Sequence, residues 1–250
     1  MMNQEPLISV ITVCYNSKDT IERTFKSILN QTYPNIEYIV VDGKSTDGTI
    51  ELIKEYEKYF QKRNITFKWI SEPDKGIYDA MNKGLTMATG ELIGIINSDD
   101  YYENSALEIV ATEYLKDSSY DVYHGLLKYY NSGKLSMIKG EDSSVLPKHM
   151  IEHPTCFLKK KTYEKYGYFN CKYKYVADYE LLCRIKKNGG KFKLIDKVIA
   201  NFFDGGAGDC LESVIEALKF RMEYGFIDKK IYLLTYIKLR IGRILNKLTE

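Results

Sequence analysis

Short apolar runs alternate with amphipathic segments along the first hundred residues of this 250-residue chain. An apolar run of about four to eight residues predicts a buried strand, and apolar residues three and four positions apart predict a helix. The pattern predicts strands at 7–14, 36–41, 67–70 and 92–96, and helices at 20–30, 49–60 and 78–87. Such alternation is typical of βαβ units, whose strands run parallel. We therefore expect an α/β fold with a mostly parallel central sheet flanked by helices.

The second half of the chain carries further elements, predicted as helices at 106–115 and 178–187 and strands at 121–127, 155–158 and 192–199. The composition shifts after residue 203, where a glycine-rich segment at 204–208 leads into a helical tail. Glycine suits either a mobile lid or a plain flexible connection at this point. We expect one α/β domain over residues 1–205 and a C-terminal helical extension over 206–250.

The composition is that of a soluble globular protein, with 44% hydrophobic and 28% charged residues. Its net charge of +2 gives no reason to expect a nucleic acid partner. Five scattered cysteines with no Cys-x-x-Cys pair fit reduced thiols in a cytosol. The N-terminus lacks the pattern of a signal peptide, and no apolar run is long enough to span a bilayer. We expect a cytoplasmic protein.

The strand predicted at 92–96 ends in two adjacent carboxylates, Asp99 and Asp100. Neighbouring carboxylates repel each other unless a cation or hydrogen-bond donors offset their charge. The carboxyl edge of a parallel sheet is where open α/β folds bind ligands. Hard oxygen ligands suit Mg²⁺ or Mn²⁺ held together with substrate phosphates. The alternative is that one aspartate caps the helix that begins near Asn104 and Ser105.

The residues at the ends of the first two strands show which classes of nucleotide-binding protein are disfavoured. The first strand runs into Cys14-Tyr-Asn-Ser without a glycine, and neither a G-x-G-x-x-G nor a P-loop pattern occurs. Dinucleotide-dependent dehydrogenases and P-loop NTPases are therefore disfavoured. Asp42 closes the second strand, where an acidic residue is placed to accept hydrogen bonds from a nucleoside. Asp47, followed by Gly48, is interpreted as part of a turn.

Three ordered motifs carry a resemblance to a known family: PLISVITVCYN at 6–16, IVVDGKSTDG at 39–48 and GELIGIINSDD at 90–100. Together they resemble family 2 inverting glycosyltransferases with a GT-A fold, over about residues 6–205. The chain looks most like bacterial enzymes that build surface polysaccharide, such as those of colanic-acid type. The resemblance implies transfer of a sugar from a nucleotide donor, with UDP preferred, to a saccharide or lipid-linked saccharide. It also implies a nucleotide-sugar-binding half at 1–102 and an acceptor-binding half at 103–205.

The resemblance implies roles for individual residues on the donor side. Around the base and ribose it places Thr12, Cys14, Tyr15, Asn16 and Asp42. Lys75 lies in the segment that approaches the diphosphate. The resemblance also places Ser98 among the residues that bind the nucleotide. Asn97-Ser98-Asp99 stands where the family has its metal-binding D-x-D signature, with Asn97 in place of the first aspartate. A neutral amide is a weaker ligand, so Asp99 should contact the Mn²⁺ or Mg²⁺ directly and Asp100 should support it.

On the acceptor side, Asp178 matches the family's catalytic carboxylate, although Ala177 replaces the glutamate that often precedes it. An inverting transfer needs one base to take the proton from the attacking hydroxyl, which is worth about 10²–10⁴ in rate. The alternative, that Asp178 only caps its helix, is compatible with catalysis. Three further residues are candidates for contacting the acceptor: Tyr101, His153 and Glu180.

The tail predicts an amphipathic helix at 228–248. Its apolar stripe consists of Leu234, Ile237, Ile241, Ile244, Leu245 and Leu248, and its flank carries Lys229, Arg240, Arg243 and Lys247. A basic amphipathic helix can lie on an anionic membrane surface, here the inner face of the membrane. The same stripe can instead pack on the catalytic domain or on a second subunit of a homodimer.

Two other functions remain as alternatives. A sugar nucleotidyltransferase would want a glycine-rich basic loop directly after the first strand, and Cys14-Tyr-Asn-Ser does not supply one. A non-catalytic, membrane-associated nucleotide-binding subunit would keep the nucleotide site without needing the base. Substitution of Asp178 separates that alternative from catalysis.

Overall fold

A computed structural model describes residues 5–203 and 210–249, with side chains as far as residue 241. Its strands are β1 (Ile8–Cys14), β2 (Ile36–Asp42), β3 (Thr66–Ser71), β4 (Leu92–Ile95), β5 (Tyr101–Tyr102), β6 (Val122–Asn131), β7 (Lys134–Lys139), β8 (Phe157–Lys159) and β9 (Phe192–Phe203). Its helices are α1 (Ile21–Leu29), α2 (Thr49–Lys62), α3 (Ile77–Met87), α4 (Ala106–Lys116), α5 (Lys160–Tyr166), α6 (Ala177–Lys187), α7 (Leu211–Glu223) and α8 (Lys229–Thr249). Two short 3₁₀ turns, η1 (Ser143–Val145) and η2 (His153–Thr155), precede β8.

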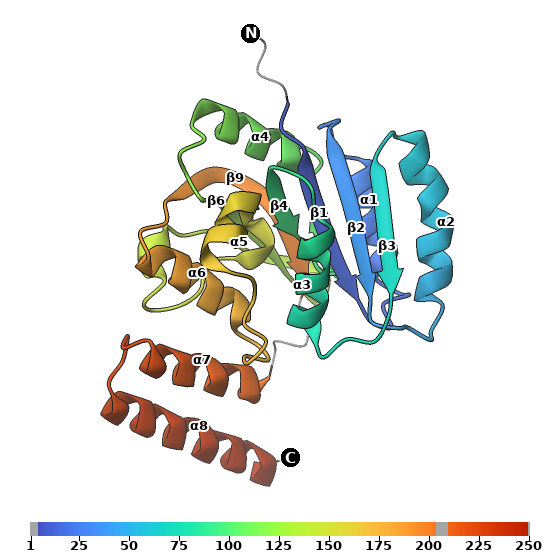
Figure 1. Cartoon of the computed structure of the whole chain (residues 1–250). Helices are drawn as coiled ribbons and strands as arrows, with labels where there is room; N and C mark the ends of the chain where they lie inside the picture. Colours follow the sequence, from blue (N-terminus) through green and yellow to red (C-terminus); the bar gives the residue numbers. More distant parts are fainter. Residues whose placement is uncertain (1–4, 204–209, 250) are drawn as a thin grey trace.

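Within the described residues the strands form one sheet in the order β3-β2-β1-β4-β8-β6-β9-β5, with β7 paired to β6 (Figure 1). The strands β1 to β4 are mutually parallel, as the alternating pattern predicted. Beyond β4 the sheet is mixed, because β8 runs antiparallel to both β4 and β6. The α/β prediction is therefore confirmed, with parallel pairing concentrated in the first half. Strands from residues 1–102 and strands from residues 103–205 belong to this one sheet.

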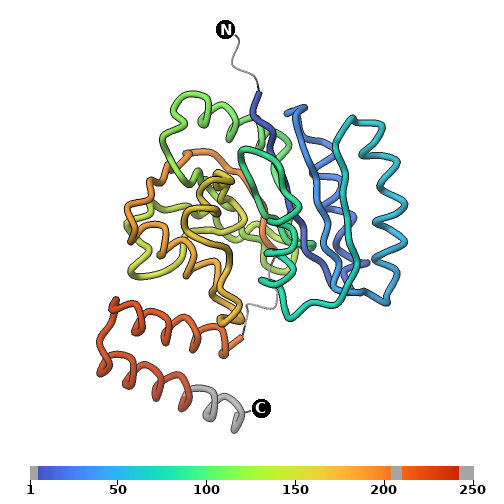
Figure 2. The backbone as a smooth tube through the Cα atoms, viewed as in Figure 1, coloured from blue at the N-terminus to red at the C-terminus, as the bar shows by residue number. Residues whose placement is uncertain are grey.

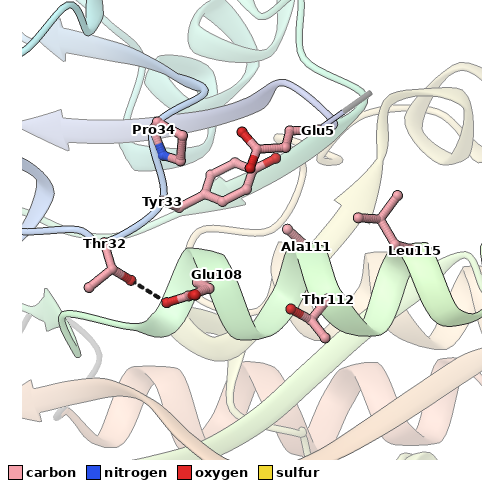
Figure 3. Close-up of a pocket in the computed structure, with 8 residues that line it drawn as sticks. All are labelled: Glu5, Thr32, Tyr33, Pro34, Glu108, Ala111, Thr112 and Leu115. Atoms are coloured by element: carbon pink, nitrogen blue, oxygen red, sulfur yellow. Dashed lines mark hydrogen bonds between the residues drawn. The ribbon is translucent and has the colours of Figure 1, made fainter. Parts of the chain in front are cut away.

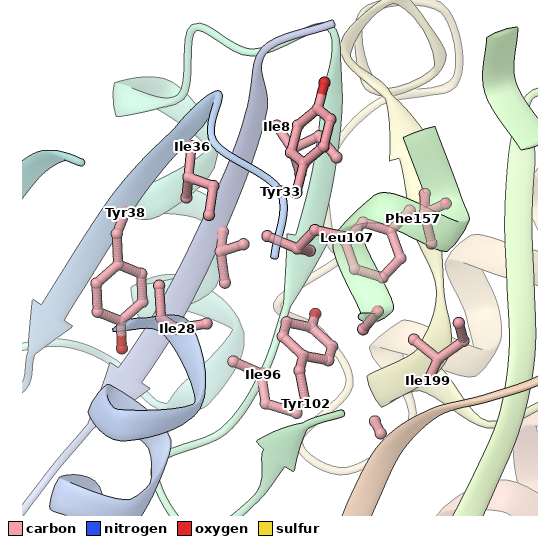
Figure 4. Close-up of a cluster of buried hydrophobic side chains, with 14 of the residues drawn as sticks. Ile8, Ile28, Tyr33, Ile36, Tyr38, Ile96, Tyr102, Leu107, Phe157 and Ile199 are labelled. Carbon is pink, nitrogen blue, oxygen red and sulfur yellow. The ribbon is translucent and has the colours of Figure 1, made fainter. Parts of the chain in front are cut away.

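Both faces of the parallel strands are buried, so successive residues enter two different cores. On one face Ile8 and Val10 pack with side chains from α1, α2 and α4 (Figure 4). On the other face Ile11 and Val13 pack with side chains from α3, α6 and α7. The helices thus cover both faces, and the carboxyl edge of the strands is the edge left for polar loops.

The predicted elements of the first hundred residues lie within about two residues of the observed ones. The strands β5 and β7 and the helix α5 were not predicted. The two residues of β5 are too few to show a pattern, and β7 is an edge strand whose apolar side chains are exposed, Leu135, Met137 and Ile138 among them. The glycine-rich segment at 204–208, and with it the boundary expected at 205, lies outside the described residues.

The tail forms two helices that run side by side (Figure 2). Phe220 of α7 is fully buried, with its ring centroid 4.8 Å from that of Tyr179 in α6. The predicted helix at 228–248 is confirmed as α8. Five of its apolar side chains are about half exposed, namely Ile231, Leu233, Leu234, Ile237 and Ile241. In the described part of the chain, no helix has the length and hydropathy of a membrane span.

Truncating Phe220 should therefore destabilise the whole protein. We expect Phe220→Ala to lower the free energy of unfolding by about 3–5 kcal/mol, since it deletes a fully buried ring and leaves a cavity. Val214→Ala on the same helix removes a half-exposed side chain and should change it by less than about 0.5 kcal/mol. Denaturant titration of both variants measures the difference. Equal effects would contradict the packing of α7 on the domain.

His124 gives a second test of the core, because burial lowers its pKa to about 4. The unfolded chain protonates this histidine near pH 6.5, whereas the native protein does so only near pH 4. Native stability is therefore lost as the pH falls through this window. We expect His124→Gln to reduce the acid destabilisation between these two pH values by on the order of 3 kcal/mol. Parallel pH dependences of unfolding in wild type and variant would contradict the burial.

Candidate functional site

Polar loops from three strands meet at the carboxyl edge of the sheet. The backbone N–H of Asn16, after β1, donates to the hydroxyl of Ser45, after β2, over 2.8 Å. The side chain of Asn16 in turn accepts from the N–H of Thr46 at 2.9 Å. Ser98, after β4, donates to the hydroxyl of Ser17 at 2.9 Å. The segments that follow β1, β2 and β4 therefore form one connected rim.

Asp42 organises the centre of this rim and is fully buried. Its carboxylate accepts from the N–H of Ser45 at 3.0 Å, from the Ser45 hydroxyl, and from the Ser71 hydroxyl at 2.6 Å. The thiol of Cys14 contacts it at 3.6 Å, and burial, reinforced by the charge of Asp42, raises the pKa of this thiol. Cys14 therefore stays protonated. For Asp42 to accept from a nucleoside, one of the two serine hydroxyls must turn away.

Gly43 lets two side chains approach the turn after β2. A Cβ atom at this position would lie 2.6 Å from the Asp74 carboxylate and 3.3 Å from the ring of Tyr15. Tyr15 itself is 64% exposed, so a face of its ring is open for stacking at the rim. Asp74 was not singled out in the sequence, since its segment carries no pattern that links it to β2. Lys75 beside it is exposed, and its N–H donates to Asp79 at 3.0 Å.

Thr12 lies in the core. It is fully buried, and its hydroxyl accepts from Tyr38 at 3.0 Å within the core. The residue lies inside β1, two positions before the strand ends, and its side chain points between the helices and the sheet. The structure gives Thr12 a hydrogen bond within the core, and its place in the nucleotide site stays a prediction.

The turn after β4 holds acceptor atoms that lack donors. Among the described residues, Asn97 Oδ1 and Asp100 Oδ2 are buried without a hydrogen-bond partner. The other oxygen of Asp100 accepts from the N–H of Phe203 at 3.2 Å. Burial raises the pKa of Asp99, and burial together with the charge of Asp99 raises that of Asp100. Ser105, which precedes α4, makes no side-chain cap, and the N–H of Leu107 in the first turn donates to the side chain of Gln31 at 3.1 Å, so neither aspartate has the capping role considered as the alternative.

These acceptors fit a divalent cation. A buried carboxylate and amide without donors are costly unless a positive charge or a proton compensates them. No group of three or more histidine, cysteine or acidic side chains that could hold a metal occurs in the described ranges. Mg²⁺ and Mn²⁺ need few protein ligands when substrate phosphates and water complete their shell. The residues Asn97, Asp99 and Asp100 suit that mode of binding.

Arg23 of α1 supports this acidic turn and was not predicted. Its guanidinium donates to the backbone oxygen of Asp99 and lies 3.6 Å from the centroid of the Phe203 ring. The positive charge of Arg23 favours the ionised form of both aspartates. It therefore offsets part of the rise in their pKa that burial causes. Tyr101 joins the same cluster, with its ring 5.8 Å from that of Phe203 and its pKa raised to about 12, chiefly by burial. Tyr101 is thus held by side chains of the protein itself.

Asp178 lies in the first turn of α6 and is half-buried. Its Oδ1 accepts from the hydroxyl of Tyr78 at 2.9 Å and from the N–H of Tyr179 at 2.8 Å. Burial and the charge of Asp178 raise the pKa of Tyr78, so that hydroxyl remains a donor. Tyr78 is the second residue of α3, which follows the loop from the carboxyl end of β3, and this places Asp178 at the same carboxyl edge as Asp42. The sequence alone did not connect Tyr78 with Asp178, which are one hundred positions apart.

Two acceptor-side candidates are less open than expected. Glu180 is 4% exposed and is held by Arg184 at 3.0 Å and by the Tyr224 hydroxyl at 2.5 Å. These contacts anchor the first turn of α6, and a role of Glu180 toward the acceptor stays a prediction. His153 is also buried, and this lowers its pKa, although Asp178 acts in the opposite direction. His153 is neutral near pH 7 and close enough to Asp178 to feel its charge.

A cavity of about 210 Å³ lies at the opposite edge of the sheet (Figure 3). It is lined by residues of α4 such as Glu108, by the segment before β2 with Tyr33, and by Glu5 before β1. The Tyr33 hydroxyl donates to the backbone oxygen of Pro6, just before β1 begins. This cavity is therefore at the amino ends of the strands and is separate from the site described above.

Comparison with known proteins matches residues 9–176 to the model of glycosyl transferase family 2. TuaG of Bacillus subtilis (strain 168), provisionally named a teichuronic acid biosynthesis glycosyltransferase, is 40% identical over 108 residues. The matched segment is 43% of this chain and 42% of TuaG, so the chain matches less than half of that relative.

Two solved structures share the fold at 20% sequence identity. S. aureus TarS 1–349 in complex with UDP-GlcNAc gives a TM-score of 0.69 over 86% of this chain and 65% of that one. The mannosyltransferase PcManGT from Pyrobaculum calidifontis, in complex with GDP-Man and Mn²⁺, gives 0.65 over 86% and 61%. The expected GT-A fold is thereby confirmed. Since the family model covers more than half of the sequence, from β1 to the residue before α6, the chain belongs to glycosyl transferase family 2.

Proposed function

We propose that this protein transfers a sugar from a nucleotide donor to a hydroxyl of a saccharide or lipid-linked saccharide, with inversion, in bacterial surface polysaccharide biosynthesis. The observation that carries the proposal is the pair of donorless acceptors, Asn97 Oδ1 and Asp100 Oδ2, on the rim that also presents Tyr15 and Asp42. The UDP-GlcNAc in the TarS complex and the name of TuaG support a UDP-linked donor and a cell-surface product.

The donor side would use the loops after β1, β2 and β4. Tyr15 offers an exposed ring to the base, and Asn16 and Asp42 lie next to it for the ribose. Lys75 is exposed on the loop before α3, where a cation can reach the diphosphate. Asp99, supported by Asp100 and Asn97, would hold Mn²⁺ or Mg²⁺, and the Mn²⁺ of the PcManGT complex supports this metal. A bound cation supplies charge neutralisation for the departing nucleoside diphosphate.

The acceptor side would use Asp178 as the base. As the acceptor hydroxyl attacks the anomeric carbon, its proton passes to the Asp178 carboxylate, and the bond from that carbon to the diphosphate oxygen breaks. Both hydrogen bonds to Asp178 reach Oδ1, so Oδ2 receives neither of them and is the atom we assign to the proton. One in-line displacement completes the transfer without a covalent enzyme intermediate. His153 is neutral and lies near Asp178, where it would help to orient the acceptor.

A panel of nucleoside diphosphates and nucleotide sugars, with and without Mn²⁺, tests the donor assignment by thermal shift. A ligand at about 100 times its dissociation constant adds about 2.7 kcal/mol of stability. We expect a metal-dependent shift with one diphosphate and its sugar conjugates. Absence of a shift with every member would contradict the proposal. Stabilisation by nucleoside triphosphates alone would favour the nucleotidyltransferase alternative.

We also propose that α8 lies on the inner face of the cytoplasmic membrane. Five of its apolar side chains are about half exposed, and residues 229–249 include six basic and no acidic residues. Anionic lipid attracts such a helix and its apolar face enters the interface. Co-sedimentation with anionic vesicles, lost in Leu234→Glu, is the expected result. A dimer in solution without vesicle binding would instead assign the stripe to a second subunit.

A further inference from the structure

Glu216 of α7 gathers three consecutive backbone N–H groups with one carboxylate. Oε1 accepts from Lys174 at 2.9 Å, and Oε2 accepts from Tyr175 at 2.6 Å and Val176 at 3.1 Å. These three residues form the segment that leads directly into α6. Two positions after Val176 comes Asp178.

This segment depends on α7 for its hydrogen bonds. Val176, the residue that precedes α6, has no side-chain oxygen and makes no capping hydrogen bond, and in the first turn the N–H of Tyr179 donates to Asp178 itself. Hydrogen bonds from N–H groups to a carboxylate are short and stronger than bonds between neutral groups. A single carboxylate of the tail therefore fixes the backbone of the three residues that lead into α6.

Two further contacts fasten α7 and the residue after it to the same end of α6. The Tyr224 hydroxyl donates to Glu180 at 2.5 Å, and Glu180 also binds Arg184 one turn later. The buried ring of Phe220 packs on Tyr179, which directly follows Asp178. The tail therefore contacts residues just before Asp178 and residues just after it in the sequence.

We propose that Glu216 is a positioning residue, which holds the start of α6 so that the Asp178 carboxylate faces the acceptor. The proposal rests on the function proposed above, in which Asp178 is the base. It extends that function by making α7 part of the catalytic machinery, although the sequence placed it in a C-terminal extension. A displacement of about 1 Å at a reacting group can reduce the rate by about 10²-fold.

Two variants test the role of the carboxylate. Glu216→Gln keeps the size of the side chain but replaces an acceptor oxygen with an NH₂ group, and Glu216→Ala removes all acceptors. The matched control is Glu223→Gln, which removes one negative charge from the same helix while its partners are the side chains of Tyr173, Lys172 and Lys219. No backbone N–H of residues 174–176 loses its acceptor in that control.

The first readout is amide hydrogen exchange of residues 172–180, which needs no substrate. We expect faster exchange there in Glu216→Gln than in wild type or Glu223→Gln, with the exchange of β1 and β2 unchanged. Unchanged exchange of residues 172–180 in Glu216→Gln would overturn the proposal. If Glu216→Ala does not fold, Glu216→Gln alone gives the answer.

The second readout is UDP release from UDP-GlcNAc with Mn²⁺. We expect kcat to fall at least 10-fold in Glu216→Gln with a KM that changes by less than about twofold, since the donor loops lie elsewhere. In an Asp178→Asn background the same substitution should cause no further loss, because residues that act as a unit are not additive. An unchanged kcat in Glu216→Gln, with Asp178→Asn inactive, would overturn the positioning role alone. An active Asp178→Asn would overturn the base assignment itself.

Discussion

Asp178→Asn is expected to lower kcat by about 10²–10⁴-fold while leaving donor binding unchanged, which corresponds to about 3–5 kcal/mol of transition-state stabilisation. The amide keeps the size of the side chain and can still accept from Tyr78 and Tyr179 through its oxygen. It cannot take up the proton of the acceptor hydroxyl. The loss should therefore appear in the chemical step, and steady-state kinetics together with donor titration measures both terms.

Asp196→Asn is the matched control for this substitution, since Asp196 lies exposed on β9 and has no part in the proposed site. It should retain wild-type kcat and KM. If Asp178→Asn transferred sugar at the wild-type rate, the base would have to be another group. If it lost donor binding as well as rate, Asp178 would belong to the donor site rather than to the acceptor side.

Asp99→Asn carries the second large effect, on metal-dependent binding. In wild type, UDP at about 100 times its dissociation constant with Mn²⁺ should add about 2.7 kcal/mol to the free energy of unfolding. We expect most of this gain to disappear in the variant, because Asn97 already replaces one carboxylate and a second amide would leave Asp100 as the charged group of the turn. Differential scanning calorimetry with UDP, with and without Mn²⁺, measures the gain.

Without metal, the same variant should be at least as stable as wild type. Burial raises the pKa of Asp99, so its ionised form is unfavourable in the native state and an amide removes that penalty. Asp196→Asn should behave as wild type in both conditions. Full metal-dependent stabilisation in Asp99→Asn would contradict the assignment of the cation to this turn.

The sequence identified the acidic turn and the ends of the parallel strands because these features are local. An apolar run followed by Asp99 and Asp100 specifies a strand end and its carboxylates without reference to the rest of the chain. Strand alternation likewise gave β1 to β4 to within about two residues. Contacts between segments far apart in the sequence could not be predicted. Examples are the hydrogen bonds between Tyr78 and Asp178, Arg23 and Asp99, and Val176 and Glu216.

Two of the expected site residues, Thr12 and Glu180, are more buried than their place in the sequence suggested. Thr12 lies in a strand buried on both faces, so alternation does not reveal that its hydroxyl serves a tyrosine in the core. Glu180 follows Asp178 by two positions and therefore points away from it around the helix, toward the tail. Short strands such as β5 carry too few residues for any pattern, and its pairing with β9 is a tertiary property.

The central claim is that a nucleotide donor and a cation bind at the turn after β4 while Asp178 faces the transferred sugar. Anomalous diffraction from crystals grown with Mn²⁺ and UDP-GlcNAc tests it most directly. The account predicts a manganese peak about 2 Å from an Asp99 oxygen and from diphosphate oxygens, with the Asp178 carboxylate on the opposite side of the anomeric carbon. A peak away from residues 97–100, or an Asp178 carboxylate turned away from the sugar, would contradict it.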